Sequence, residues 1–164
     1  MRFISIIWTK YSDPVSELVY NLTGRTYTHA AISLEEDCSY YYSFCFKGFR
    51  RETVEKYRRR GVKKSLRLRL EVPDDVYEGL QQKVDFVERN SHNYEYTTFG
   101  VFCALLHIPF RRHRHYFCSQ FVAELLESTG AAHFSCPACL MLPHHLLREL
   151  KAAPGLCESI PGIV

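Results

Sequence analysis

One cysteine in this sequence has a position that suits nucleophilic chemistry. Cys118 comes directly before an apolar run at helical spacing, from Phe121 to Leu126, and Gly130 ends that run. The first N–H groups of a helix have no intrahelical acceptor, and together with the helix dipole they favour a thiolate, which is the nucleophilic form of cysteine. Because free cysteines are more often buried and inert, a nucleophilic role for Cys118 requires a second residue that activates it.

His29 is the residue best placed to supply that activation. It begins an apolar, strand-like run from Tyr27 to Leu34 and is followed by Ala30 and Ala31. Small neighbours leave room for another element to approach, and a strand holds an imidazole more rigidly than a loop does. The other seven His residues fall in predicted loops, helix ends or basic clusters. Cys118 and His29 are therefore the candidate nucleophile and base, although either residue taken alone also fits a structural role.

Other site chemistries find little support in the sequence. It has no glycine-rich phosphate loop, no His-Glu-x-x-His helix and no Gly-x-Ser-x-Gly elbow. Cys136 and Cys139 have the spacing of half a zinc or redox site, but no second pair completes it. We therefore expect no metal and no cofactor.

The elements around these residues predict a single α+β domain over residues 1–164, because strands and helices are segregated along the chain. Strands are predicted at 3–8, 27–34, 39–46 and 65–72. Helices are predicted from Pro14 to Gly24 with Asp13 as N-cap, and at about 53–59, 74–90, 97–107, 118–129 and 143–150. The 97–107 helix is expected to be more buried than the helix before it, the segment after residue 46 to be mainly loop, and the last ten residues to be irregular.

Charge and cysteine content suggest the compartment and the possible partners. The net charge is +3, but residues 47–64 contain nine Lys or Arg and two Glu, a local charge of +7, and a second basic cluster follows at 111–115. Such clusters either contact a polyanion or form a solvated surface. Seven cysteines without a framework-like pattern favour reduced thiols and a cytoplasmic protein. No apolar run is long enough for an integral membrane segment.

Three segments together resemble a known family. They are Thr-His-Ala-Ala-Ile-Ser at 28–33, Tyr-Tyr-Ser-Phe at 41–44 and Tyr-Phe-Cys-Ser-Gln-Phe-Val-Ala-Glu-Leu-Leu at 116–126. In this order the sequence is similar to the circularly permuted NlpC-like branch of the papain-like cysteine peptidases, in which the His precedes the Cys. The resemblance covers roughly residues 1–150. It implies a permuted papain-like fold, with an antiparallel sheet packed against helices and the nucleophile at a helix N-terminus.

The resemblance also implies the roles of individual residues. Cys118 would be the nucleophile, with its backbone N–H stabilising the oxyanion, and His29 would be the base. A third polar group should orient the imidazole, and here two residues compete: Ser43 matches the family by position on the following strand, and Glu52 by its chemistry. Which of the two orients His29, or whether neither does, stays open.

Two tyrosines are candidates for substrate contact: Tyr116, two residues before Cys118, and Tyr41, in the strand after the His29 strand. The leading hypothesis is a cysteine hydrolase that cleaves an amide bond in a peptide or peptidoglycan-derived fragment. The alternatives are a lipid acyltransferase or thioesterase with the same fold, as in the lecithin-retinol acyltransferase type, a protein with this fold that has lost catalysis, and a non-catalytic protein that binds nucleic acid or another polyanion through segment 47–64. The oligomeric state is left open.

Overall fold

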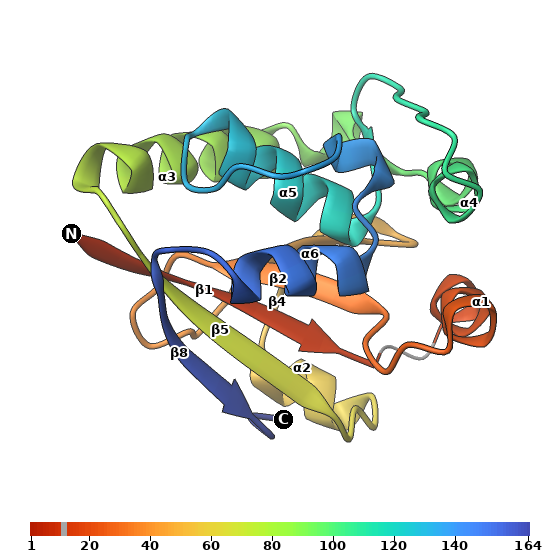
Figure 1. Cartoon of the computed structure of the whole chain (residues 1–164), viewed down its shortest axis with the longest axis horizontal. Coiled ribbons are helices and arrows are strands. Elements are labelled where there is room, and N and C mark those ends of the chain that lie inside the picture. The colour runs from red at the N-terminus through yellow and green to blue at the C-terminus, as the bar shows by residue number, and fades with distance from the viewer. Residues whose placement is uncertain (11–12) are drawn as a thin grey trace.

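A computed structural model describes residues 1–10 and 13–164 of the chain. Within them lies a six-stranded sheet in the order β4-β3-β2-β1-β5-β8 (Figure 1), and each strand pair in it is antiparallel. Its strands are β1 (Arg2–Thr9), β2 (His29–Ser33), β3 (Tyr41–Cys45), β4 (Gly48–Glu52), β5 (Ser65–Val72) and β8 (Leu156–Pro161). A short parallel pair outside this sheet joins β6 (Glu95–Tyr96) to β7 (His115–Tyr116).

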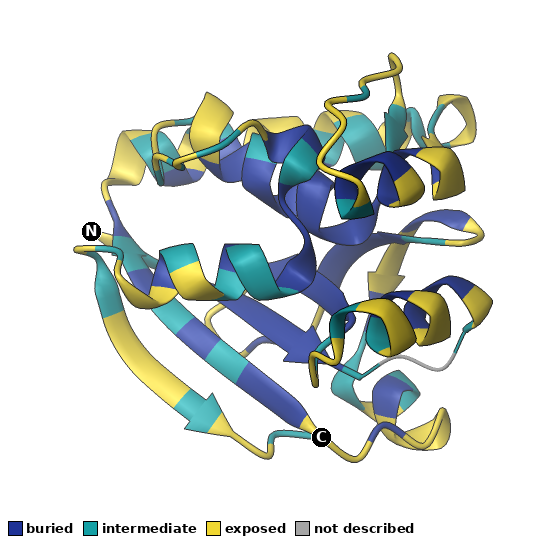
Figure 2. Ribbon diagram, turned by 45° about the vertical axis from the view of Figure 1, so that its right-hand side comes forward, coloured by how far each residue is buried: buried dark blue, intermediate teal, exposed yellow. Residues whose placement is uncertain are grey.

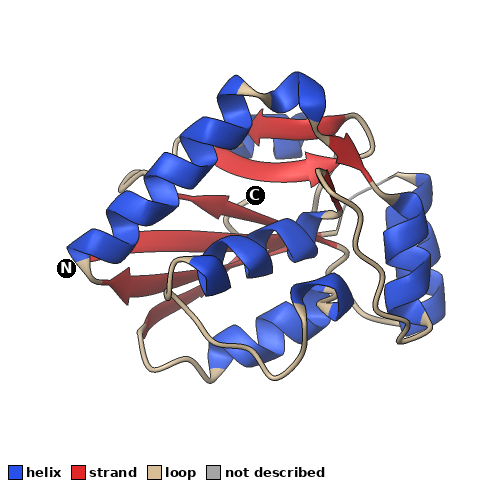
Figure 3. Cartoon of the chain, turned by 90° about the horizontal axis from the view of Figure 1, so that it is seen from above, coloured by secondary structure: helices blue, strands red, loops and turns tan. Residues whose placement is uncertain are grey.

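The helices cover the two faces of the sheet unequally. They are α1 (Pro14–Thr23), α2 (Val54–Arg59), α3 (Asp74–Arg89), α4 (Thr98–Leu105), α5 (Cys118–Ser128) and α6 (Pro143–Lys151), with short 3-10 turns at Ser91–Asn93 and Ala138–Leu140. Helices α3, α5 and α6 pack on one face and α2 on the other. Helices α1 and α4 lie together at one end of the sheet (Figures 1 and 3).

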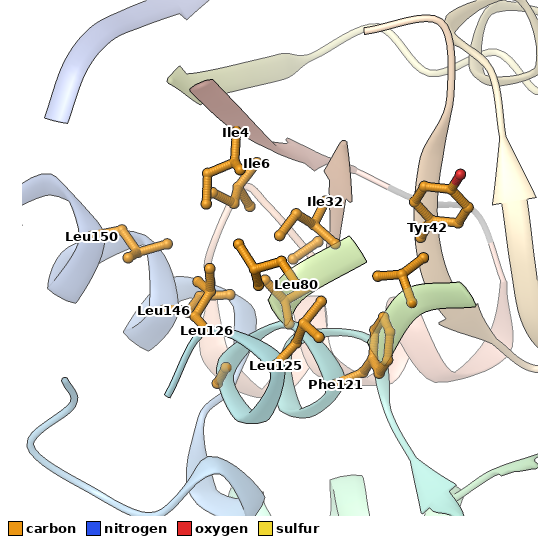
Figure 4. Close-up of a cluster of buried hydrophobic side chains, with 14 of the residues drawn as sticks. Ile4, Ile6, Ile32, Tyr42, Leu80, Phe121, Leu125, Leu126, Leu146 and Leu150 are labelled. Atoms are coloured by element: carbon orange, nitrogen blue, oxygen red, sulfur yellow. The ribbon is translucent and has the colours of Figure 1, made fainter. Parts of the chain in front are cut away.

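Alternation along the strands builds the main core. On β1, Ile4 and Ile6 point to the face covered by α3, α5 and α6, whereas Ile7 points to the α2 face. Figure 4 shows Ile4, Ile6 and Ile32 meeting Leu80 of α3 and side chains of α5 and α6. The main core thus fixes α5, and with it Cys118, against the sheet.

The α+β class and the antiparallel sheet packed against helices are confirmed. The helix predicted from Pro14 is also confirmed: the Asp13 carboxylate accepts the N–H groups of Val15 and Ser16, and Gly24 ends the helix at a φ of 64°. The permuted papain-like fold stays a prediction.

Two predictions about elements were wrong. The segment after residue 46 begins with a strand, β4, because a two-residue turn brings Gly48 opposite Cys45. The last ten residues contain an edge strand, β8, paired with β5. The prediction that α4 is more buried than α3 is confirmed, because four of its eight residues are buried against three of sixteen in α3, although Phe99 and Phe102 are 60% and 49% exposed. In the described residues, no helix has the length and apolar character needed to cross a membrane.

Replacement of a core leucine tests this packing. Leu80 is fully buried (Figure 4), so Leu80→Ala should lower the free energy of unfolding by about 2–5 kcal/mol because it leaves a cavity. Leu22 is also in a helix but is 62% exposed, and Leu22→Ala is the matched control, with an expected change of about 0.5 kcal/mol or less. Urea unfolding followed by circular dichroism measures both, and equal losses would contradict the packing described.

Candidate active site

Cys118 is the first residue of α5, as the sequence predicts. Phe117 before it has an extended backbone, and the side-chain oxygen of Gln120 accepts the Phe117 N–H at 3.4 Å. Helix α5 packs on β2 and β3, which brings the sulfur to 4.0 Å from the Thr28 carbonyl oxygen, at the start of β2. The thiol therefore lies beside the residue that precedes His29, with the first N–H groups of α5 near it.

His29 begins β2 and is held between β1 and α5. Its backbone pairs with Thr9 of β1, and its side chain is buried. The imidazole interacts with both the Cys118 thiol and the Glu52 carboxylate. Because Nε2 lies 3.4 Å from Oε2 of Glu52, Nδ1 is the nitrogen available to Cys118. The ring thus connects a nucleophile to a carboxylate.

Glu52 reaches this position because of the strand that the sequence did not predict. It is the last residue of β4 and pairs with Tyr41 of β3, which turns its side chain toward the α2 face of the sheet. Its carboxylate is buried, with 1% of the residue exposed. Of the two candidates for the third position, the structure therefore brings Glu52 to the imidazole.

Ser43 has a different partner. Its hydroxyl is buried and donates to the carbonyl oxygen of Ala30 at 2.7 Å, so it joins β3 to β2. A hydroxyl has one proton to donate, and Ser43 donates that proton to the backbone carbonyl oxygen of Ala30. The contact positions the strand that carries His29 rather than the ring itself.

Several groups stabilise the charge on the buried Glu52. Lys56 Nζ and Arg60 Nη1 lie 3.3 Å and 3.5 Å from Oε1, and the Tyr57 hydroxyl hydrogen-bonds the carboxylate. Burial by itself raises the pKa of Glu52, but His29, Lys56 and Tyr57 outweigh it, and the pKa is lowered. Glu52 is therefore ionised at neutral pH.

The same contacts determine the protonation of His29. Burial lowers the pKa of the imidazole, but hydrogen bonds and charge interactions with Cys118 and Glu52 outweigh that effect and raise the pKa to about 10. An imidazolium between two groups that can be anionic is the arrangement of a thiolate–imidazolium pair supported by a carboxylate.

The two tyrosines predicted to contact substrate lie elsewhere. Tyr116 lines a cavity of about 290 Å³ between α3 and α5, where its hydroxyl donates to Glu124 at 2.9 Å. Tyr41 has no exposed surface and packs against Tyr57 on the α2 face. The described residues that line the crevice beside Cys118 include neither of them. Substrate contact by Tyr116 or Tyr41 stays a prediction that these positions do not support.

Sequence reasoning missed Tyr57 and did not single out Tyr96, two further residues of the site. Tyr57 is fully buried and contacts both Glu52 and the His29 ring, whose centroid is 6.3 Å away. Tyr96 lines the crevice at Cys118, and its pKa is raised by burial and by charge interactions with Cys118 and Asp13. Neither tyrosine has a local sequence signal, since each reaches the site through tertiary packing.

The crevice itself is small. It has a volume of about 10 Å³, and Cys118 is 6% exposed. Its walls include Val15 and Val19 of α1, Val101 of α4, and Leu142 and Pro143 at the start of α6. The reactive groups are thus nearly closed off from solvent.

The other candidate sites lack similar geometry. Among the described residues, no three His, Cys, Asp or Glu side chains form a group that could hold a metal ion, and Cys136 and Cys139 are free thiols. In the basic segment 47–64, Lys56 and Arg60 lie against Glu52, and Arg51 lies 3.7 Å from Glu88. Ion pairs within the protein therefore neutralise part of the positive charge of this segment, and binding of a polyanion stays a prediction.

The sequence matches no known family model, and no curated protein matches it. The resemblance to the permuted NlpC-like branch therefore stays a prediction that depends on its three motifs, and the site is interpreted from its own geometry.

Acid titration tests the role of the buried carboxylate. Because the pKa of Glu52 is lower in the folded protein than its ordinary value of 4.5, its ionised form stabilises the fold above about pH 4.5, and this stabilisation is lost as the pH falls through the folded pKa. Glu52→Gln should therefore be less stable than wild type at about pH 6, and the difference should shrink toward about pH 3. Urea unfolding across this pH range measures the free energy of unfolding of both proteins. A difference between them that does not change with pH would contradict the lowered pKa of Glu52.

Proposed function

We propose that this protein is a cysteine hydrolase that cleaves an amide bond through Cys118, His29 and Glu52. One observation carries the proposal: the His29 ring contacts the thiol at the start of α5 and the buried carboxylate at the end of β4. A buried imidazole linked to both groups has the parts needed to generate a thiolate and to move a proton.

The first half of the reaction uses the pair in its charged form. The Cys118 thiolate attacks the carbonyl carbon of the amide, and the resulting oxyanion is stabilised by N–H groups at the start of α5. When the C–N bond breaks, the His29 imidazolium gives its proton to the leaving amine. A thioester on Cys118 and a neutral imidazole remain.

The second half returns the site to its starting state. A water molecule attacks the thioester while His29 takes one of its protons, the C–S bond breaks, and the products are a carboxylic acid and the Cys118 thiolate. Glu52 accepts from His29 at Nε2 in both halves. It therefore keeps the other ring nitrogen directed at the thiol and stabilises the imidazolium.

The proposed substrate is a peptide or a peptidoglycan-derived fragment, and the proposed location is the cytoplasm. Support for the substrate class is the motif resemblance to the permuted NlpC-like branch. Support for the location is that all seven cysteines are free, as a reducing compartment would keep them.

Alkylation across pH tests the thiolate directly. At about pH 6 an ordinary thiol is mostly protonated, so iodoacetamide should modify Cys118 about tenfold faster than Cys157, despite the burial of Cys118. Cys157 is an exposed free thiol in the same chain and serves as the internal reference. Peptide mapping by mass spectrometry measures both rates.

The controls for this labelling are Cys118→Ala and His29→Ala. Cys118→Ala must lose the modified peptide, and His29→Ala should remove the advantage at about pH 6, because the thiolate then lacks its imidazolium partner. If Cys118 and Cys157 followed the same pH dependence in wild type, the thiolate–imidazolium pair would be refuted.

Hydrolysis assays compare the two residues considered for the third position. With a panel of short peptides and peptidoglycan stem peptides, Cys118→Ala should abolish turnover, and Glu52→Gln should lower kcat/KM by about 10²-fold because it leaves His29 without its anionic partner. Ser43→Ala removes only a hydrogen bond to the backbone and should stay within about threefold of wild type. A larger loss of kcat/KM for Ser43→Ala than for Glu52→Gln would show that Ser43, and not Glu52, supports His29.

A further inference from the structure

A patch of large apolar side chains is exposed at the end of the sheet where α4 lies. Phe99, Phe102, Leu106 and Ile108 are 60%, 49%, 55% and 50% exposed, and the half-buried Phe110 stacks edge-on against Phe99 with ring centroids 4.9 Å apart. We call these five residues the α4 surface. In Figure 2 the loop that follows α4 is exposed along most of its length.

The spacing on α4 shows that this exposure is one face of the helix. Phe99, Phe102 and Leu106 follow one another at intervals of three and four residues, while Val101 and Ala104 are buried against α1. A helix that is apolar on its outer as well as its inner face needs a partner for the outer face.

Charge complementarity identifies the class of that partner. Between Glu95 and Glu124 the sequence has no acidic residue. The exposed Arg111, Arg112 and Arg114 follow the α4 surface directly, and of these Arg111 also pairs with Glu124 at 3.0 Å. Apolar side chains with an adjacent arginine cluster match a bilayer that carries anionic head groups over an apolar interior.

We propose that the α4 surface docks this protein onto an anionic lipid bilayer, with its apolar side chains in the interface and the arginines against the head groups. A second copy of the chain fits less well, because a two-fold contact through this patch would place the arginine cluster close to its own symmetry mate. The proposal stands apart from the chemistry at Cys118, since it depends only on the α4 surface and on the arginines that follow it.

Docking there would bring lipid close to the candidate site. Val101, on the inner face of α4, lines the crevice beside Cys118, so a single helix about 10 Å across separates the docking face from the crevice. Cleavage of a substrate carried by a membrane would then require no long transfer through water.

Vesicle co-sedimentation of Cys118→Ala protein tests docking without any contribution from catalysis. Binding is expected to vesicles of phosphatidylcholine with about 30% phosphatidylserine, with several-fold weaker binding to phosphatidylcholine alone, and a decrease as salt rises from about 0.1 to 0.5 M. The double variant Phe99→Ser/Phe102→Ser should weaken binding at least about tenfold, as should Arg112→Glu.

Phe86→Ser is the matched control, because Phe86 is 57% exposed on α3, outside the α4 surface. It should bind vesicles as wild type does. Failure to bind at low salt, or an equal loss for Phe86→Ser, would overturn the proposal. So would a dimer in light scattering that Phe99→Ser/Phe102→Ser dissociates, since a second copy would then cover the patch.

Discussion

The buried charge of Glu52 is the constraint on which the candidate site depends. A carboxylate with 1% exposure is costly unless opposite charges and hydrogen-bond donors surround it. The structure supplies these from two directions: His29 from β2, and Lys56, Tyr57 and Arg60 from α2 and its end. Helix α2 therefore does more than cover the second face of the sheet. It keeps Glu52 ionised, and the negative charge of Glu52 acts on the His29 imidazole.

This arrangement explains why the third member of the site was left open at the level of sequence. Cys118 and His29 each have a local sequence signal: Cys118 lies at a helix start, and His29 lies in an apolar strand with small neighbours. The structure brings these two side chains together. Glu52 depends on β4, whose turn has no Asn-Gly or Asp-Gly signal. Gly48 enters the strand at a φ of 88°, and this one glycine gave too little evidence for a hairpin within a basic segment.

The fold was predictable where local chemistry decides the structure and not where distant packing does. Capping residues located α1, and strict alternation located β5. Strand β8 has a mostly exposed pattern and forms because β5 offers an unpaired edge about 90 residues earlier in the chain. The composition of α4 predicts burial, which holds for its inner face, but its position at the end of the sheet leaves the outer face, with Phe99 and Phe102, largely exposed.

The closed crevice has a consequence for how the site can work. Cys118, His29 and Glu52 are held by the sheet and α5, whose buried side chains belong to the main core and to the cluster on the α2 face, so their geometry is rigid. Part of the wall beside the sulfur comes from α1 and α4, and Leu142 and Pro143 add to it. Helices α1 and α4 meet through a separate cluster, smaller than the main core, that includes Val15, Val19 and Val101. Separating α1 from α4 disrupts contacts within this cluster and leaves the main core intact. Access to Cys118 should therefore be controlled by α1 and α4, while the residues that do the chemistry stay in place.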